Sequence, residues 1–429
     1  MKKELSGAYE KVVKSVEERR GEITDLLRSL VSTPSVAGSE KEAQEIIINK
    51  LKELNLSVDV FEPKLDELKA HPAYTSMKSE EGYEGRPNVV GTLRGSGGGR
   101  SIILNGHVDT IPFGEVERWS THPLSAEIEN GKLYGRGACD MKGGVASMIM
   151  AVKCVAESGI ELKGDVIVQS VIAEEQGGAG TLACLLRGYR ADAAVITEPT
   201  SLEIQPAQVG AMYGTITVYG KPAHSGWSYE GVSALEKSIK IHDALVDFER
   251  ERLRSLHHPL AERYPIPPCT LNIGILNAGD YFGKVPEKAT MKFRIGVMPG
   301  EDYRSVREDI RRLITVLALK DDWMKDHPPE IDWTGFPSLW EPTEIDPSHP
   351  IVSTLKEAFK DATGREATLG VMPAGTDMRL FTIYADIPTL LCGPGDPKMA
   401  HQFDEYISVE EVITATKVYA LTALRWCGV

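Results

Sequence analysis

Hydrophobic residues follow two different patterns along the chain. In residues 1–207, apolar runs of strand length, such as 101–104 and 165–173, alternate with segments whose apolar residues recur at helical spacing, such as 143–157. Strands that alternate with helices in this way predict a mostly parallel sheet with helices on both faces. The same pattern resumes in residues 338–429, so we assign both parts to one α/β domain.

Residues 208–337 follow the second pattern. Four alternating strands and two helices succeed one another in the order βαββαβ, with the strands predicted at residues 212–219, 270–276, 289–297 and 330–333. This order predicts a small antiparallel sheet with two helices, a ferredoxin-like α+β domain. We therefore predict that residues 208–337 form a second domain inserted into the first.

Several local signals predict individual elements of the first domain. Apolar residues at helical spacing predict one helix over residues 8–31, and a capping-box pattern at Ser39 predicts the start of the next. Residues 63–87, rich in Pro, Lys and Glu, are interpreted as a surface loop. The strands at 88–93 and 101–104 are separated by a glycine-rich turn and are predicted to form a hairpin.

Composition and charge narrow the function classes. The chain has 48 Lys and Arg against 62 Asp and Glu, and the net charge of −14 argues against a nucleic-acid or anionic-membrane partner. No apolar run reaches the roughly 18 residues of a membrane helix, and the N-terminal stretch lacks the apolar centre of a secretion signal. Six scattered cysteines without a CxxC pair are typical of free thiols in a reducing compartment. We therefore expect a soluble, cytoplasmic protein.

Histidine and carboxylate residues gather near the ends of predicted strands. The candidates are His107, Asp140, Glu174, Glu175, Glu198 and His401. Singly, each has an ordinary explanation: Asp140 as the cap of the next helix, for example, or the glutamate pair as a complement to a helix dipole. Together, imidazole and carboxylate groups form a ligand set that suits zinc, cobalt or manganese.

Two ions and a base would complete the chemistry of such a site. A bridging carboxylate can hold a pair of ions, and a further carboxylate is needed to take a proton from the attacking water. Glu174 and Glu175 fit this division of roles, because neighbouring side chains of an extended chain point in opposite directions.

An ordered set of motifs carries a resemblance to a known family. The motifs are GHVDT at 106–110, GRGACDMKGG at 135–144, AEEQGG at 173–178, TEPT at 197–200, GKPAHSG at 220–226, GTDMR at 375–379 and the loop histidine at 401. The set resembles the dinuclear zinc metallopeptidase family that includes acetylornithine deacetylase, succinyl-diaminopimelate desuccinylase, aminoacylase and glutamate carboxypeptidase. The match runs from about residue 20 to the end of the chain, in the family's order and spacing.

The resemblance implies a role for each matching ligand. His107 and Glu198 would bind one metal ion. Glu175 and His401 would bind the other, and Asp140 would bridge the two. The implied cofactors are two divalent ions, zinc above all, with cobalt or manganese as alternatives.

The resemblance also implies three catalytic residues. Glu174 would be the general base, and Asp109 would hydrogen-bond the second nitrogen of His107 and fix its tautomer. His224, in the inserted domain, matches a histidine that in dimeric relatives reaches the neighbour's active site and steadies the oxyanion. The inserted domain is therefore expected to act as a lid and to form a homodimer.

The substrate-binding positions depart from the family pattern. Many relatives carry an Asn and an Arg at the positions of Gly283 and Gly296. Arg294 shares the strand face of position 296 and is a candidate replacement. Thr376 and Arg379 are further candidates, although Arg379 is equally well interpreted as a surface residue of a first helical turn.

These inferences predict a metal-dependent amidohydrolase that removes an acyl group from an N-acyl amino acid or a related amine. Two alternatives are a dipeptidase or carboxypeptidase, and a deacylase or deformylase of a substrate without an α-carboxylate, which the missing Asn and Arg favour. A non-catalytic binding protein is the alternative from another class. The presence of Glu174 beside all five expected ligands argues against it, because a scaffold needs no base.

Overall fold

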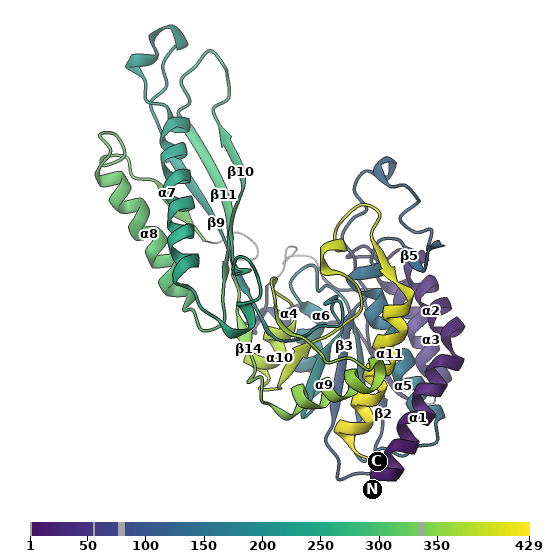
Figure 1. Ribbon diagram of the computed structural model, residues 1–429. Helices are drawn as coiled ribbons and strands as arrows, with labels where there is room; N and C mark the ends of the chain where they lie inside the picture. The colour runs from purple at the N-terminus through teal and green to yellow at the C-terminus, as the bar shows by residue number, and fades with distance from the viewer. Residues whose placement is uncertain (1, 55, 76–81, 334–338) are drawn as a thin grey trace. The chain divides into compact units, whose positions relative to one another are not determined.

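The computed structural model of the chain describes residues 2–54, 56–75, 82–333 and 339–429 (Figure 1). It separates into two compact units. We call them unit 1 (Met1–Ala207, Glu344–Met372 and Thr376–Val429) and unit 2 (Gln208–Thr343 and Pro373–Gly375). The chain leaves unit 1 after residue 207 and returns to it at residue 344.

A nine-stranded sheet forms the centre of unit 1 in the described residues. Its strands, in spatial order, are β1 (Ser57–Phe61), β2 (Asn88–Leu93), β6 (Val166–Val171), β3 (Ile102–His107), β7 (Ala193–Ile196), β16 (Thr389–Leu391), β8 (Ile204–Gln208) and β14 (Thr343–Glu344), with β15 (Leu369–Met372) beside β8. The neighbours β6, β3, β7 and β16 run parallel to one another. The predicted α/β fold with a mostly parallel sheet is confirmed.

Helices cover the central strands of this sheet. Helices α5 (Gly143–Glu157) and α11 (Val409–Cys427) contact β3, α6 (Ala179–Leu186) contacts β6, and α3 (Lys41–Glu53) contacts β2. Every residue of β3, β6 and β7 is buried. This burial explains why these strands are nearly continuous apolar runs in the sequence rather than alternating ones.

The predicted hairpin between residues 88–93 and 101–104 is wrong. Strand β6 lies between β2 and β3, antiparallel to the former and parallel to the latter. The glycine-rich turn crosses the start of β6 instead: Ser96 N donates to Leu162 O and Gly97 N donates to Lys163 O, both at 2.8 Å. The short connection between β2 and β3 therefore passes over one intervening strand, β6, which pairs with both of them.

Three other local predictions need correction. The helix expected over 8–31 is two helices, α1 (Lys2–Glu18) and α2 (Arg20–Ser32), separated by the non-helical Arg19. Ser39 does not cap α3, whose N-cap position is Glu40; that side chain binds Arg86 instead. The segment 63–87 contains the short helix α4 (Leu65–Lys69), and its residues 76–81 lie outside the described residues.

Unit 2 has the predicted βαββαβ order. Its elements are β9 (Gly210–Tyr219), α7 (Ala234–Ser255), β10 (Leu271–Ala278), β11 (Lys288–Val297), α8 (Tyr303–Leu319) and β12 (Glu330–Asp332). The four strands lie in the order β10-β11-β9-β12 with antiparallel pairing throughout. Buried residues of both helices, including Ile241 and Ile310, share a core with Ile216 and Met291 of the sheet.

Two further findings concern the whole described chain. All six cysteines are free thiols, as predicted, and the structure shows that all six are buried. Among the helices that the structure describes, none combines the length and the apolar character needed to cross a membrane.

Candidate metal centre

Parallel strands deliver the candidate residues to one edge of the unit 1 sheet. Strand β3 ends at His107, β7 is followed by Glu198, and β6 is followed by the turn that carries Glu174 and Glu175. The carboxyl ends of neighbouring parallel strands lie at the same edge, which is where ligands gather in open α/β sheets. The sheet thus brings these side chains together although they are far apart in the sequence.

Asp140 lies between the two histidines. Its Oδ1 is 3.1 Å from Nε2 of His107, and its Oδ2 is 3.4 Å from Nε2 of His401. The N-cap position of α5 is Lys142, so Asp140 is not the helix cap that a simpler interpretation would make it. The carboxylate thus places one oxygen beside each histidine, an arrangement that would suit a carboxylate shared by two ions, one bound to each histidine.

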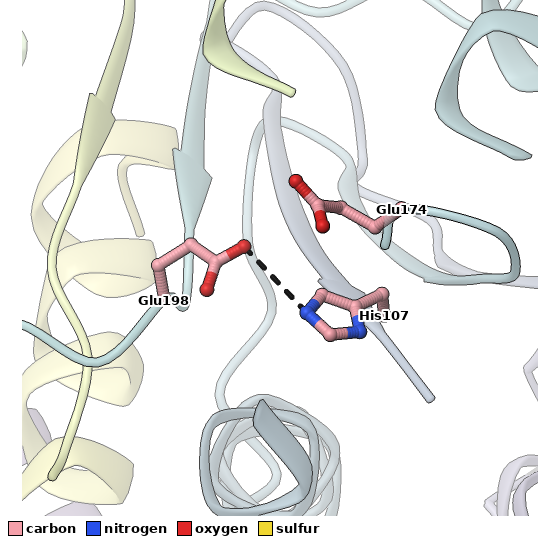
Figure 2. Close-up of side chains that lie close together, drawn as sticks. All are labelled: His107, Glu174 and Glu198. Atoms are coloured by element: carbon pink, nitrogen blue, oxygen red, sulfur yellow. Dashed lines mark ion pairs between the residues drawn. The ribbon is translucent and has the colours of Figure 1, made fainter. Parts of the chain in front are cut away.

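Two glutamates complete this group. Oε1 of Glu175 is 2.9 Å from Nε2 of His401, and Oε1 of Glu198 is 3.7 Å from Nε2 of His107 (Figure 2). His401 reaches the site from the loop after β16 and has φ of 65°, whereas the other members follow strands or precede α5. The structure therefore gathers all five residues that the sequence proposes as metal ligands.

Glu174 lies next to this group. Figure 2 shows its carboxylate near His107 and Glu198, and atoms of these three residues lie within 4.8 Å of one another. The chain here is a turn, closed by Gly177 N donating to Glu174 O at 2.8 Å, and not the extended segment that we expected. The two glutamate side chains still have different neighbours: Glu174 lies beside His107 and Glu198, whereas Glu175 contacts His401. The geometry allows Glu174 to act as a base or as a ligand.

Asp109 orients several groups at once. Nδ1 of His107 is 2.8 Å from the main-chain oxygen of Asp109, while the carboxylate Oδ1 lies 3.5 Å away. The hydrogen bond expected from the carboxylate is thus made by the carbonyl, which fixes the same tautomer and leaves Nε2 for a metal. The carboxylate instead accepts hydrogen bonds from the backbone N–H groups of Glu174 and Glu175, at 3.2 and 3.1 Å.

The charges of the site fit a cation. Burial, and then the negative charges of Glu198 and Asp377, raise the pKa of Glu174 well above its ordinary value. Hydrogen bonds to two site carboxylates raise the pKa of His401 to about 10. A divalent ion would stabilise the buried carboxylate anions and displace the imidazole proton, so the donor set suits metal binding.

Two buried carboxylates near the site were missed by the sequence interpretation. Asp377 is 1% exposed, and burial raises its pKa to about 6. Glu405 accepts hydrogen bonds from the backbone N–H groups of Cys139 and Asp140. Both residues lie in segments that the sequence had marked, the GTDMR motif and the loop of His401. An acidic residue four positions after a candidate ligand was the available signal for Glu405.

The substrate-binding candidates have defined surroundings. Arg379 is 1% exposed, and its Nη2 donates to the carbonyl oxygens of Ala73 and Gly177, so the interpretation as a surface residue is wrong. Thr376 Oγ1 accepts a hydrogen bond from Met378 N at 3.1 Å. In unit 2, Arg294 Nη2 donates to Pro373 O at 3.4 Å. Their roles in substrate binding stay predictions.

His224 belongs to unit 2 and is exposed there. Its Nδ1 accepts a hydrogen bond from Gly226 N at 3.1 Å, and its ring lies 5.4 Å from that of Trp227. Ser225 N donates to Gly283 O, which joins this segment to the one preceding β11. Nδ1 is thus engaged within this segment, and the exposed ring retains its second nitrogen, Nε2, as a donor or acceptor.

Comparisons with known proteins give a consistent result. The model of the family described as peptidase family M20/M25/M40 matches residues 103–425. An N-formyl-4-amino-5-aminomethyl-2-methylpyrimidine deformylase of Bacillus subtilis (strain 168) is 32% identical, with 97% of each chain covered. An acetylornithine deacetylase of Proteus mirabilis (strain HI4320) is 27% identical, with 90% of this chain and 92% of the relative covered. The solved structure of a dinuclear metal-binding peptidase from Bacillus subtilis superposes with a TM-score of 0.63 at 18% identity, covering 95% of this chain and 98% of the other.

Proposed function

The chain belongs to peptidase family M20/M25/M40 and is a hydrolase of amide bonds, and from that premise we propose that it removes a small acyl group from an amine with two divalent metal ions. The observation that carries the proposal is the position of Asp140, which offers one carboxylate oxygen to His107 and the other to His401. The prediction of an amide-hydrolysing enzyme is confirmed by the family membership.

We propose zinc as the native metal, with cobalt or manganese as alternatives. His107 and Glu198 would hold one ion, Glu175 and His401 the other, and Asp140 both. Bound there, the ions would supply Lewis acidity toward the acyl carbonyl and the attacking water. The imidazole and carboxylate donors support this choice, since they suit borderline metals and leave room for a water.

Glu174 is proposed to move the proton. Its carboxylate accepts a proton from the attacking water and returns it to the leaving amine, so that the amine departs neutral. The raised pKa supports this role, because a higher pKa makes the carboxylate a stronger base toward the attacking water. Asp109 holds the Glu174 backbone N–H and thereby keeps the carboxylate in place.

An amine without an α-carboxylate is the substrate class that we favour. A side chain at position 283 would begin 2.7 Å from the Tyr281 ring, and one at position 296 would begin 2.5 Å from the Cys269 backbone. At these two positions, where many relatives carry an Asn and an Arg, neighbouring atoms of this chain therefore occupy the space that a side chain would need. The deformylase relative, whose name gives a formylated aminomethylpyrimidine as its substrate, supports the same class.

A substrate screen tests this proposal. We expect kcat/KM for an N-formyl aminomethylpyrimidine to exceed that for N-acetylornithine by about 100-fold or more, because an α-carboxylate that loses its hydration without a compensating contact costs binding energy. N-acetyl, N-succinyl and N-formyl amines and simple dipeptides would be compared with zinc, cobalt and manganese. Preferential cleavage of dipeptides would overturn the deacylase assignment in favour of the peptidase alternative.

We further propose a homodimer formed through unit 2, in which His224 serves the active site of the partner. Unit 2 exposes apolar side chains on one helix and its neighbouring edge strand: Leu235 and Ile239 on α7, and Ile275 and Leu276 on β10. An edge strand with exposed apolar residues is a ready surface for pairing with a second copy. His224 would then donate a hydrogen bond to the oxyanion.

Mixed dimers test the role of His224. Glu174→Gln and His224→Ala variants are each expected to be inactive, and mixing them should restore up to about a quarter of the wild-type rate, since random exchange gives half hybrid dimers with one intact site each. Activity and subunit exchange would be followed together, the latter by mass spectrometry of differently tagged chains. No recovery despite proven exchange would show that His224 does not act across the dimer.

A further inference from the structure

Two members of the candidate metal centre, Asp140 and His401, come from distant parts of the chain, and their side chains must be held in a fixed relative position. Asp140 lies just before α5, whereas His401 lies in the loop of residues 392–405 after β16. His107 and Glu198, in contrast, follow the neighbouring strands β3 and β7, which the sheet itself aligns. The alignment of Asp140 with His401 therefore needs contacts outside the sheet.

Glu405 makes these contacts. It is 1% exposed, and its Oε1 accepts hydrogen bonds from the backbone N–H groups of Cys139, at 2.9 Å, and Asp140, at 3.1 Å. Its main-chain oxygen accepts a third hydrogen bond, from Gly135 N at 2.9 Å. Glu405 lies four positions after His401, so the same loop carries a metal-ligand candidate and the residue that holds the backbone of Asp140.

Arg136 links the segment of Asp140 to the loop of His401. Its Nη1 donates to Glu405 Oε2 at 2.8 Å and to the main-chain oxygen of Gln402 at 3.2 Å, next to His401. The guanidinium is almost fully buried, as is the carboxylate. The pair thus joins the segment of Asp140 to the loop of His401 through hydrogen bonds that water does not compete for.

We propose that Glu405 is a positioning residue that aligns Asp140 with His401 and thereby sets the affinity of the second metal ion, the one held by Glu175 and His401. The proposal rests on the ligand assignment of the proposed function. The first ion, held by His107 and Glu198, depends on Glu405 only through Asp140, since the sheet positions its other two ligands. Loss of the Glu405 carboxylate should therefore weaken the two ions unequally.

Glu405→Gln is the direct test. The amide has the same volume, but whichever way it is turned its NH₂ group faces a donor, either the N–H groups of Cys139 and Asp140 or the Arg136 guanidinium. Metal affinities would be measured by competition with a chromophoric chelator, and stoichiometry by elemental analysis. We expect one ion to lose affinity by about 10- to 100-fold and the other to stay within about twofold. Activity should return when metal is added in excess.

Asp165→Asn is the matched control. Asp165 also accepts one arginine N–H, from Arg94, and one backbone N–H, from Gly95, but it lies just before β6, at the end of the strand opposite the turn of Glu174. Both metal affinities should be unchanged in this variant. Arg136→Lys is the second test variant, because lysine retains the charge but lacks the guanidinium whose Nη1 donates to both Glu405 and Gln402, and it should weaken the same ion to a smaller degree.

Three outcomes would overturn the proposal: unchanged affinities in folded Glu405→Gln, equal weakening of both ions, or, should Glu405→Gln not fold, unchanged affinities in folded Arg136→Lys. Folding would be monitored by circular dichroism and thermal melting. Failure of the proposed function is distinguishable, because it would appear in the wild-type protein as the absence of two bound ions.

Discussion

Glu174→Gln is expected to lower kcat by about 10³-fold, because glutamine keeps the size of the side chain but cannot accept a proton from the attacking water. KM should change little, since the substrate contacts remain. Steady-state kinetics on the substrate identified in the screen would measure the effect. Glu129→Gln, a replacement on the exposed strand β4 (Ile128–Glu129), is the matched control and should retain wild-type kcat.

The metal content of Glu174→Gln decides between two roles that the geometry allows. A carboxylate oxygen of Glu174 lies within 4.8 Å of the ligand atoms of His107 and Glu198, so Glu174 could bind the same ion as these two residues. A base predicts near-normal metal content together with lost turnover. A ligand predicts that metal is lost with the activity, and retained activity would remove both roles.

Asp140→Asn is expected to have the second large effect, on both ions at once. Asparagine keeps the shape of the side chain but has only one oxygen, whereas the carboxylate faces His107 with Oδ1 and His401 with Oδ2. We expect metal content after dialysis to fall from two ions to less than one, and kcat/KM to fall by more than about 100-fold. Elemental analysis and kinetics in a series of metal concentrations would measure both.

Single-site variants provide the comparison for Asp140→Asn. Glu198→Gln should weaken the ion shared with His107, and His401→Asn the ion shared with Glu175. Each should leave the other ion in place at high metal concentration. If Asp140→Asn weakened only one ion, Asp140 would be a terminal ligand and not a bridge.

The gathering of the candidate site was predictable from the sequence to a large extent. His107 and Glu198 follow apolar runs that had to be buried parallel strands, and parallel strands share their carboxyl ends. The motif order supplied Asp140 and His401, which no strand-end argument would select. The structure gathers all of them, and their roles stay predictions.

The supporting contacts were not predictable in the same way. Asp109 orients His107 with its carbonyl oxygen and Glu174 with its carboxylate, which depends on a main-chain conformation that no side-chain pattern reports. Arg379 suited a surface helix turn by its residue type, yet it is buried against carbonyl oxygens. In both cases the hydrogen-bond partner is a backbone group. Because every residue other than proline has the same backbone N–H and C=O groups, the sequence does not show which of them will be the partner.

Local hydrophobic patterns determined the elements and the fold class of this protein, because burial of a helix stripe or a strand requires a fixed period. They also determined that a βαββαβ unit interrupts the α/β domain. Only the tertiary structure decided which strands are neighbours, and it put β6 between β2 and β3, where the sequence suggested a hairpin. It also decided that Glu405 holds Asp140 across 265 residues of chain. The physical reason is the same for both: pairing between distant segments is selected by the packing of the whole sheet and loop, and a local period carries no information about its distant partner.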